Sequence, residues 1–434
     1  MNRLPPSLIA LSHRNYRLLW FGLLISMSGS LMRNAVILWH VSLLVPEDQQ
    51  AIALGGVGLV RVIPILIFSF ISGVIADAVN RHKLMLLTNL AMMAVSGLLA
   101  FITFNGWDSL WAVYALSAVS AAIGSFDGPA RQSLFPALVP REHLSNAISL
   151  NSLMFQLASV AGPALGGVLI AAFGVAWAYV YDVTSFGVLI TSLLLMRNVP
   201  QRTITERAEI SLRAGWEGMK WVFSQPLIRS SMLLDFFATF FASAKALLPI
   251  FAQSVIVLPP ALIAVASSFG MKPEALSYGL LSSADAAGAF ITSIVMIPVI
   301  ERIQQRGRVL FAAVFVFGLA TIIFGLSANF WLSYACLALT GASDMVSTVI
   351  RNIIRQLTTP DGMRGRMTSV NMIFFLGGPQ LGEMEAGAVA QAFGPVASVV
   401  SGGVGCMLAT AWLAASTPSL LNYRKEQPAL VAAD

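Results

Sequence analysis

Two carboxylates, Glu383 and Glu385, lie in GGPQLGEMEAG, residues 377–387, among glycines and apolar residues. Helical residues two positions apart point about 200° from each other, so both cannot face one cavity. Gln380 and Glu383 share one stripe with Gly387 and Gln391. We therefore expect Gln380 and Glu383 to line a pathway, with Glu383 as a proton or substrate site. Glu385 is expected to pack against a neighbouring helix, either protonated or paired with a basic residue.

Two aspartates occupy similar apolar surroundings. Asp285 aligns with Tyr278 and Thr292 at helical spacing, and Asp344 heads a polar face that continues to Arg351 and Arg355. Burial favours the neutral form of a carboxyl group, which lets such a group exchange protons near ambient pH. Lys245 is the expected counter-charge for one of them. Asp285 and Asp344 are thus either proton-coupling groups or, with Lys245, a static ion-pair lock.

Arginines are also present in apolar segments. Arg33 follows Ser26 and Ser30 at helical spacing, Asn34 flanks it, and Arg61 lies in the next segment. Arginine stays protonated, so neither can carry protons. They either contact an anionic group of a substrate, form an ion pair inside the membrane, or extend outward to the lipid surface.

The sequence lacks the residue patterns of several kinds of catalytic, nucleotide-binding and metal site. No G-x-x-x-x-G-K-[ST], H-E-x-x-H or G-x-S-x-G motif occurs. Three of the four histidines, His13, His82 and His143, lie at segment ends, which leaves only His40 inside an apolar segment. Cys336 and Cys406 both lie in apolar runs. We expect no enzyme, metal site, cofactor or disulfide framework.

The composition indicates which elements carry these residues. The chain has 434 residues, of which 57% are hydrophobic and 11% charged. Soluble domains carry about 25% charged residues, and apolar runs of about 20 residues indicate transmembrane helices. We predict an all-α membrane protein with twelve transmembrane helices, at residues 16–44, 51–78, 83–104, 109–135, 144–172, 176–197, 227–256, 274–301, 308–327, 329–357, 364–393 and 395–416.

Charge fixes the expected orientation. With a cytoplasmic N-terminus, every Lys and Arg lies on the cytoplasmic side except four: Arg33, Arg61, Lys245 and Lys272. This bias follows the positive-inside rule and explains the net charge of +6 without nucleic acid. We expect a bacterial inner-membrane protein with both termini cytoplasmic. Its domains would be a six-helix bundle at 1–197, a linker at 198–226 with a surface amphipathic helix, a second bundle at 227–417 and a tail at 418–434.

The two halves contain an internal repeat. PARQSLFPALVPREHLSNAISLN (129–151) and VIRNIIRQLTTPDGMRGRMTSVN (349–371) share residues at one constant offset, including the pairs Arg131/Arg351 and Asn151/Asn371. The same offset relates three glycine pairs further along, Gly162/Gly382, Gly167/Gly387 and Gly174/Gly394. Transporters built from repeated halves bind substrate between them and alternate access by rocking.

A family resemblance rests on two motifs. GVIADAVNRHK (73–83) resembles the loop signature of the major facilitator superfamily, with Gly73, Asp77, Arg81 and Lys83 matching, and with Ala78 and Asn80 replacing its arginine and glycine. The resemblance implies a cytoplasmic gate built on Asp77, Arg81 and Lys83, although Arg81 and Lys83 also suit plain topology signals. Asp127 and Arg131, at i and i+4, fit an intrahelical pair joined to this gate better than substrate contact.

The second motif is NSLMFQLASVAGPALGG, which is similar to the Gly-Pro segment of exporters in this superfamily. Gly162, Gly166 and Gly167 permit close helix packing and Pro163 bends the helix. The whole chain resembles the bacterial branch that contains enterobactin exporters and macrolide efflux proteins.

These observations predict a secondary transporter. We expect a proton-coupled antiporter that exports siderophore-like or drug-like hydrophobic or amphiphilic compounds. The alternatives are a lysophospholipid transporter and a non-transporting membrane sensor on the same fold. The expected partners are a small-molecule substrate, protons and the lipid bilayer, and we expect a monomer because one chain supplies both halves.

Overall fold

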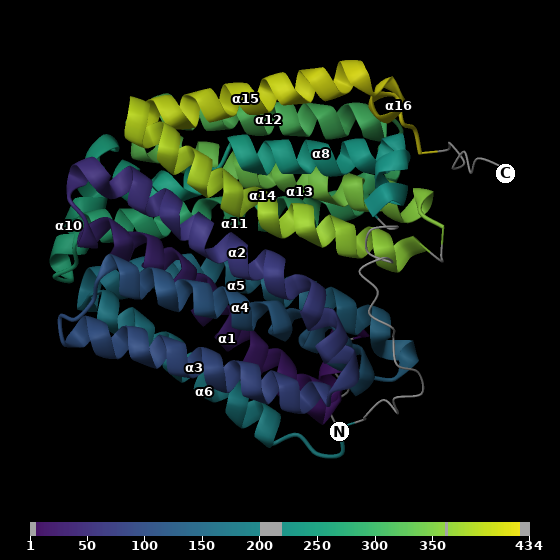
Figure 1. Ribbon diagram of the computed structural model, residues 1–434, viewed down its shortest axis with the longest axis horizontal. Coiled ribbons are helices and arrows are strands. Elements are labelled where there is room, and N and C mark those ends of the chain that lie inside the picture. The colour runs from purple at the N-terminus through teal and green to yellow at the C-terminus, as the bar shows by residue number, and fades with distance from the viewer. Residues whose placement is uncertain (1–5, 200–218, 361–362, 426–434) are drawn as a thin grey trace. The chain divides into compact units, whose positions relative to one another are not determined.

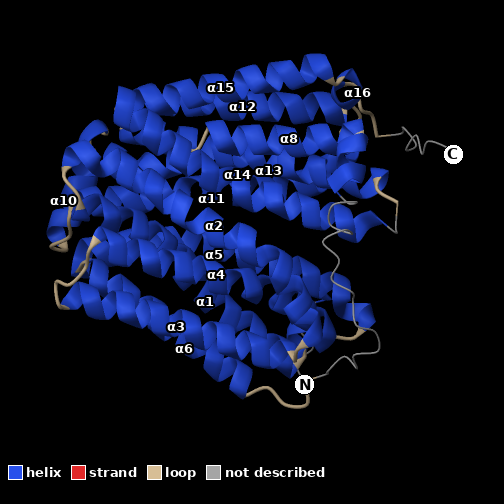
Figure 2. Ribbon diagram, viewed as in Figure 1, coloured by secondary structure: helices blue, strands red, loops and turns tan. Residues whose placement is uncertain are grey.

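The computed structural model describes residues 6–199, 219–360 and 363–425, without the side chains of residues 6, 7, 69–71, 73–78, 133, 365 and 369. Helices account for nearly all of this part of the chain (Figure 2), which contains no strand and one isolated bridge, between Val257 and Asn329. The predicted all-α fold class is confirmed.

Unit 1 is the first of two compact units and comprises Met1–Val45, Ile63–Glu209 and Pro259–Ser283. Its helices are η1 (Pro6–Ser12), α1 (Arg14–Leu44), most of α2 (Gln50–Ala78), α3 (Arg81–Phe104), α4 (Leu110–Leu134), η3 (Phe135–Leu138), η4 (Arg141–His143), α5 (Leu144–Phe173), α6 (Val175–Leu194), α10 (Pro260–Ser268) and the start of α11 (Pro273–Val299).

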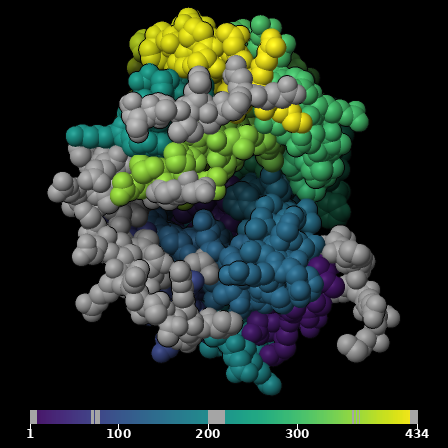
Figure 3. Space-filling model, turned by 90° about the vertical axis from the view of Figure 1, so that its right-hand side faces the viewer, coloured from purple at the N-terminus to yellow at the C-terminus, as the bar shows by residue number. Residues whose placement is uncertain are grey.

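Unit 2 comprises Pro46–Val62, Ile210–Leu258 and Ala284–Asp434. It holds η2 (Glu47–Gln49), the start of α2, α8 (Pro226–Phe241), η5 (Ala244–Leu247), α9 (Leu248–Ile250), η6 (Phe251–Val255), the rest of α11, η7 (Ile300–Arg302), α12 (Arg306–Leu326), α13 (Phe330–Thr358), α14 (Arg364–Phe393), α15 (Pro395–Ser416) and α16 (Pro418–Leu421). Figure 3 views a face where the start of α14, in light green, and the last described residues, in yellow, reach the surface.

The compact units do not coincide with the two predicted sequence halves. The start of α2 belongs to unit 2, and the start of α11 belongs to unit 1. Most of the predicted linker lies outside the described residues; its last part, residues 219–224, is helical.

Short polar side chains begin several helices. Asn80, Ser109 and Asn329 each accept a hydrogen bond from a backbone N–H in the first turn of the helix that follows them. These N-caps satisfy donors that have no partner within the helix. Gly174 and Gly394 end α5 and α14 with φ of 92° and 90°, a conformation that favours glycine.

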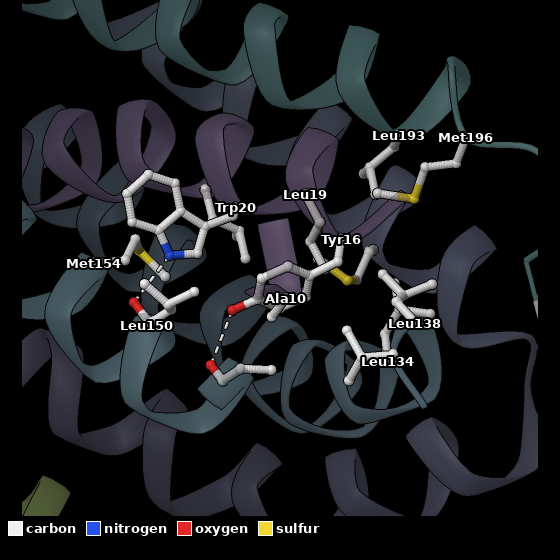
Figure 4. Packing of buried hydrophobic residues seen from close by; sticks show 14 of the residues in the cluster. Ala10, Tyr16, Leu19, Trp20, Leu134, Leu138, Leu150, Met154, Leu193 and Met196 are labelled. Carbon is white, nitrogen blue, oxygen red and sulfur yellow. Dashed lines mark hydrogen bonds between the residues drawn. The ribbon is translucent and has the colours of Figure 1, made fainter. Parts of the chain in front are cut away.

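Tyr16 and Trp20 anchor the core of unit 1 at one end of α1. Tyr16 Oη donates to the carbonyl of Ala147, and Trp20 Nε1 donates to the carbonyl of Leu150, both at 2.9 Å (Figure 4). Both side chains are buried against α5 among leucines and methionines. Their polar atoms are therefore satisfied while their rings fill the core.

The predicted repeat recurs in the helix boundaries. α5 and α14 begin at Leu144 and Arg364 and end at Phe173 and Phe393, in both cases 220 positions apart. The packing repeats as well: in unit 1, α1 contacts α5 and α6 while α3 contacts α4 and α6. In unit 2, α8 contacts α14 and α15 while α12 contacts α13 and α15, and α8, α12 and α15 run side by side in Figure 1.

Ten helices in the described ranges are long and apolar enough to cross a membrane. α13 and α14, the predicted spans ten and eleven, have suitable lengths but are not among the ten. α13 carries Asp344, Arg351 and Arg355, and α14 carries Arg364, Arg366, Glu383 and Glu385. Predicted span seven is also not one continuous helix, since Ala242 and Ser243 separate α8 from η5.

Candidate functional site

The interruption of span seven places Lys245 on η5, beyond the end of α8. Lys245 Nζ donates to Asp285 Oδ2 on α11 at 2.8 Å, and Thr340 Oγ1 on α13 donates to Asp285 Oδ1 at 3.3 Å. An ion pair between Lys245 and one of the two aspartates is therefore present, and the partner is Asp285.

This pair is accessible. The side chains of Lys245 and Asp285 are 61% and 21% exposed. A charge inside a span is far more stable in water than against lipid tails, so we infer that the ammonium faces water. Gly341 fixes the position of Asp285, because a methyl group on Gly341 would overlap the Asp285 backbone carbonyl. The close approach of α11 and α13 thus holds the pair in place.

Asp344 lies one turn from Thr340 on α13 and belongs to a second charged group. Arg351 Nη2 forms an ion pair with Asp235 on α8 at 2.8 Å, and the same nitrogen lies 3.5 Å from Asp344 Oδ1. The side chain of Asp344 is 47% exposed, whereas those of Arg351 and Asp235 are 2% and 6% exposed. One arginine is therefore shared between a buried and an accessible carboxylate. Sequence reasoning assigned no partner to Asp235.

Glu383 faces α2 inside unit 2. A methyl group on Gly58 would lie 2.8 Å from Glu383 Cβ, so the helices touch there. Glu383 interacts electrostatically with Arg61 and with Lys245. Its side chain is half-buried, and within the described chain its Oε2 atom is buried without a hydrogen-bond partner. Glu383 and Arg61, which the sequence suggested separately, thus lie in one charged group. Glu385 is also half-buried.

The glycines around these acids set the packing of α14. A methyl group on Gly382 would lie 2.5 Å from the Phe240 carbonyl oxygen on α8, and one on Gly387 would lie 2.5 Å from Gly55 Cα on α2. Gly378 likewise meets Thr239 on α8. The segment GGPQLGEMEAG therefore brings α14 against two helices, which positions Gln380 and Glu383 between them.

Arg33 forms a buried ion pair within unit 1. Its Nη1 donates to Asp182 Oδ2 at 2.9 Å and to Ser96 Oγ at 2.8 Å, and its guanidinium lies 5.5 Å from the centre of the Phe186 ring. The side chains of Arg33 and Asp182 are 4% and 0% exposed. Of the three alternatives for this arginine, the structure has the ion pair, which corrects its placement in a substrate cavity. The neighbouring Asn34 is exposed.

The gate residues are described only in part. Gly73 and Asp77 lie on α2, but their side chains are outside the described part of the structure. Lys83 is exposed, and its backbone N–H donates to the Asn80 cap. Arg81 is half-buried and engaged in an interaction.

The expected intrahelical pair between Asp127 and Arg131 is not formed. Asp127 Oδ1 accepts hydrogen bonds from Thr88 and Asn89 on α3, each at 3.0 Å. Arg131 instead points at the sulfur of Met27 on α1, 2.6 Å away. Contacts with two other helices outweigh the local i, i+4 attraction, which is worth only about 0.2–0.5 kcal/mol.

The Gly-Pro segment packs α5 closely within unit 1. A methyl group on Gly162 would lie 2.6 Å from the Ser28 carbonyl oxygen, and one on Gly166 would lie 3.0 Å from Met32 Cγ, both on α1. Gly167 meets Gly279 of α11 so closely that a side chain on either would overlap the other backbone. Pro163 lies inside α5. The packing geometry matches the prediction, and its role in transport remains a prediction.

Sequence reasoning also missed a polar contact at the end of α1. His40 Nε2 lies 2.7 Å from Asp108 Oδ2, and His40 Nδ1 lies 3.0 Å from Tyr179 Oη. His40 is buried, and both of its ring nitrogens have partners. This geometry accounts for His40 as a structural residue that joins α1, the α3–α4 loop and α6.

Comparisons with known proteins cover almost the whole chain. The family described as "Transmembrane secretion effector" matches residues 6–426. Enterobactin exporter EntS of Escherichia coli O1:K1 / APEC is 27% identical over 376 residues, which are 84% of this chain and 83% of that protein. EntS of Shigella boydii serotype 18 is equally similar. These relatives are named as transporters, not as enzymes.

Solved structures share the fold. A bacterial homologue of the human lysosomal transporter Spinster has a TM-score of 0.71 at 16% identity, covering 96% of this chain and 99% of its own. The peptide transporter POT in complex with sulfate has a TM-score of 0.72 at 11% identity, covering 96% and 99%. The family match over residues 6–426, the repeated helix bundles and these folds together lead to one conclusion. The chain is a membrane transporter of the transmembrane secretion effector family, within the major facilitator superfamily.

Proposed function

We propose that this transporter exports small amphiphilic or hydrophobic compounds, siderophore-like or drug-like, from the cytoplasm of a bacterium by proton-coupled alternating access. Its site would lie in the inner membrane, with both termini cytoplasmic. Relatives named as enterobactin exporters support the direction and the substrate range. The observation that carries the coupling is the group of ionisable side chains in unit 2, Lys245, Asp285, Asp344 and Glu383.

Asp344 is the first proposed proton carrier. Its carboxylate is half-exposed and shares Arg351 with the buried Asp235. With Asp344 protonated, Arg351 is held by Asp235 alone. With Asp344 ionised, Arg351 is attracted to both carboxylates, which favours a second arrangement of α13 relative to α8. Proton binding would thereby select between two conformations.

Glu383 is the second proposed carrier, and substrate is proposed to bind beside it. Arg61 and Lys245 supply positive charge near Glu383, and Gln380 adds an amide. Protonation of Glu383 leaves these cations able to bind an anionic or polar group of a substrate. Release of the proton restores the internal charge balance and expels that group. We also place Asp285 in this unit, as the partner that keeps Lys245 charged.

Reconstituted protein tests this proposal. Proteoliposomes with an imposed pH gradient are loaded with a catechol siderophore, a macrolide or a lysophospholipid. We expect movement of the siderophore or the macrolide that requires the gradient. Equilibration without a gradient would contradict proton coupling. Movement of the lysophospholipid alone would replace the substrate class, and no movement of any compound would contradict the proposed range.

A further inference from the structure

The last described residues fold back onto the segment before α12. Gly307 N–H donates to the Tyr423 carbonyl, and Lys425 N–H donates to the Gln304 carbonyl, both at 3.0 Å. Lys425 Nζ also pairs with Glu301 Oε2 at 2.6 Å. Gly307 permits this contact, because a methyl group there would overlap the backbone carbonyl of Leu420.

A pocket lies where the two segments meet. It contains about 460 Å³ of space, part of it open to solvent. Its lining consists of two arginines, two amides and one leucine: Gln305, Arg308, Leu421, Asn422 and Arg424. Guanidinium and amide N–H groups are donors, so this lining suits an anion with several acceptor oxygens.

The electrostatics around the pocket are one-sided. Arg302, Arg306 and Lys425 add to the two arginines of the lining, and among the described residues of these two segments Glu301 is the one acid. α12 begins with arginines at Arg306 and Arg308, has no acidic residue in its first turn and has no side-chain cap. Basic residues at the positive end of a helix repel the helix dipole, and an anion bound there relieves the repulsion.

Arg306 adds a second observation. Arg306 is only 4% exposed, and its Nε atom has no hydrogen-bond partner among the described residues. Arg306 does not itself line the pocket, so it contributes a buried positive charge beside the pocket and not a direct ligand.

We infer that this pocket binds the phosphate of an anionic phospholipid headgroup. The pocket opens beside the loop that joins α11 and α12, two helices long and apolar enough to cross a membrane, so it lies at the membrane surface. Basic pockets at the cytoplasmic membrane surface bind such headgroups, and Leu421 offers an apolar contact to the glycerol and the upper acyl chains. This site is separate from the charged side chains proposed for transport.

Lipid retention tests the inference on the full-length protein. The protein is purified in detergent with phosphatidylglycerol, and bound lipid is measured by native mass spectrometry. In Arg308→Gln/Arg424→Gln, affinity should fall about thirtyfold, since each such arginine contributes about 1 kcal/mol to binding anionic lipid. The control Arg14→Gln/Arg17→Gln removes two exposed arginines at the start of α1 and should keep the lipid.

Gly307→Ala tests whether lipid binding needs the shape of the pocket or only its positive charge. It keeps every arginine but displaces the tail, so it should lose the lipid as well. Retention by Gly307→Ala, or equal loss in the Arg14/Arg17 control, would overturn the inference. Thermal stabilisation by inorganic phosphate as strong as that by phosphatidylglycerol would show a free anion as the occupant and would overturn the lipid. Stabilisation by phosphatidylglycerol but not by phosphatidylcholine would support it.

Discussion

At the scale of single residues, the two glutamates of GGPQLGEMEAG are distinguished by what surrounds them. Glu383 lies against α2 and is attracted by Arg61 and Lys245, whereas no charged group among the described residues has a comparable effect on Glu385. We predict that Glu383→Gln abolishes pH-driven transport, because an amide cannot exchange a proton. Glu385→Gln should retain transport. Uptake into proteoliposomes under a pH gradient measures both, and the opposite pattern would reverse the assignment.

Variants of Lys245 and Asp285 can distinguish a role of this ion pair in proton coupling from a purely structural role. Lys245→Met or Asp285→Asn alone should destabilise the protein by about 1 kcal/mol, because the lysine is well exposed and its ion pair is screened. The double variant should recover that stability, since no unpaired charge remains. If the pair serves transport, the double variant regains its melting temperature but not gradient-driven transport. Recovery of both would identify a lock.

The sequence shows which charged residues lie in apolar segments, but it does not show which of them form ion pairs. Arg33 and Arg351 were both singled out in the sequence, but no role was assigned there to their partners Asp182 and Asp235. Pairing depends on helix rotation and on which helices are neighbours. Hydrophobic periodicity alone does not fix either of these.

At the scale of helices, most boundaries were predicted within three residues, because the apolar runs that form the helices end at polar residues in the sequence. The break in span seven was missed. Ala242 and Ser243 are neither proline nor glycine, so no local signal separates α8 from η5. Lys245, which pairs with Asp285, lies two residues beyond this break.

The contact of α14 with α8 yields a matched pair of glycine variants. Gly382→Ala should destabilise the protein by about 1–3 kcal/mol, as overpacking does, because its methyl group meets the Phe240 carbonyl. Gly377 lies on the same helix with nothing within 4 Å of its Cβ position. Gly377→Ala should be neutral or stabilising by up to about 1 kcal/mol. Thermal melting compares the two, and equal effects would disprove the contact.

A histidine pair joins the start of α1 to η4. His13 Nε2 lies 2.9 Å from His143 Nδ1. Burial, followed by the charge of His143, lowers the pKa of His13, and Glu142 opposes this. The unfolded chain therefore binds more protons, so this stability is present above about pH 6.5 and is lost as the pH falls through the lowered pKa.

His13→Gln should accordingly narrow the difference in melting temperature between about pH 8 and about pH 5, the range in which histidine titrates. His143→Gln should act in the same direction, because it removes the charge that repels His13. An unchanged pH dependence in both variants would assign the acid sensitivity to other groups.

At the scale of the whole chain, the repeat is the feature that sequence and structure share most fully. The constant offset found between residues also relates helix ends and two of the glycines with positive φ, Gly174 and Gly394. The order of helix contacts is also the same inside each unit. Chemistry breaks this symmetry: α14 carries Glu383 where its counterpart α5 carries Pro163. The two halves therefore share an architecture but contribute different groups.

The orientation of the chain predicts a labelling pattern. The native cysteines Cys336 and Cys406 are 6% and 0% exposed, so the unmodified protein should not react with a membrane-impermeant maleimide in intact cells. Single cysteines can replace exposed residues on either side of the membrane.

Glu47→Cys and Lys272→Cys should react in intact cells, because their loops lie on the outer side when both termini are cytoplasmic. Arg141→Cys and Arg302→Cys, at positions that are also exposed, should react only after permeabilisation. The reverse pattern would invert the topology. It would also place the basic pocket at Arg308 on the outer surface, where the positive-inside rule gives no reason for its charge.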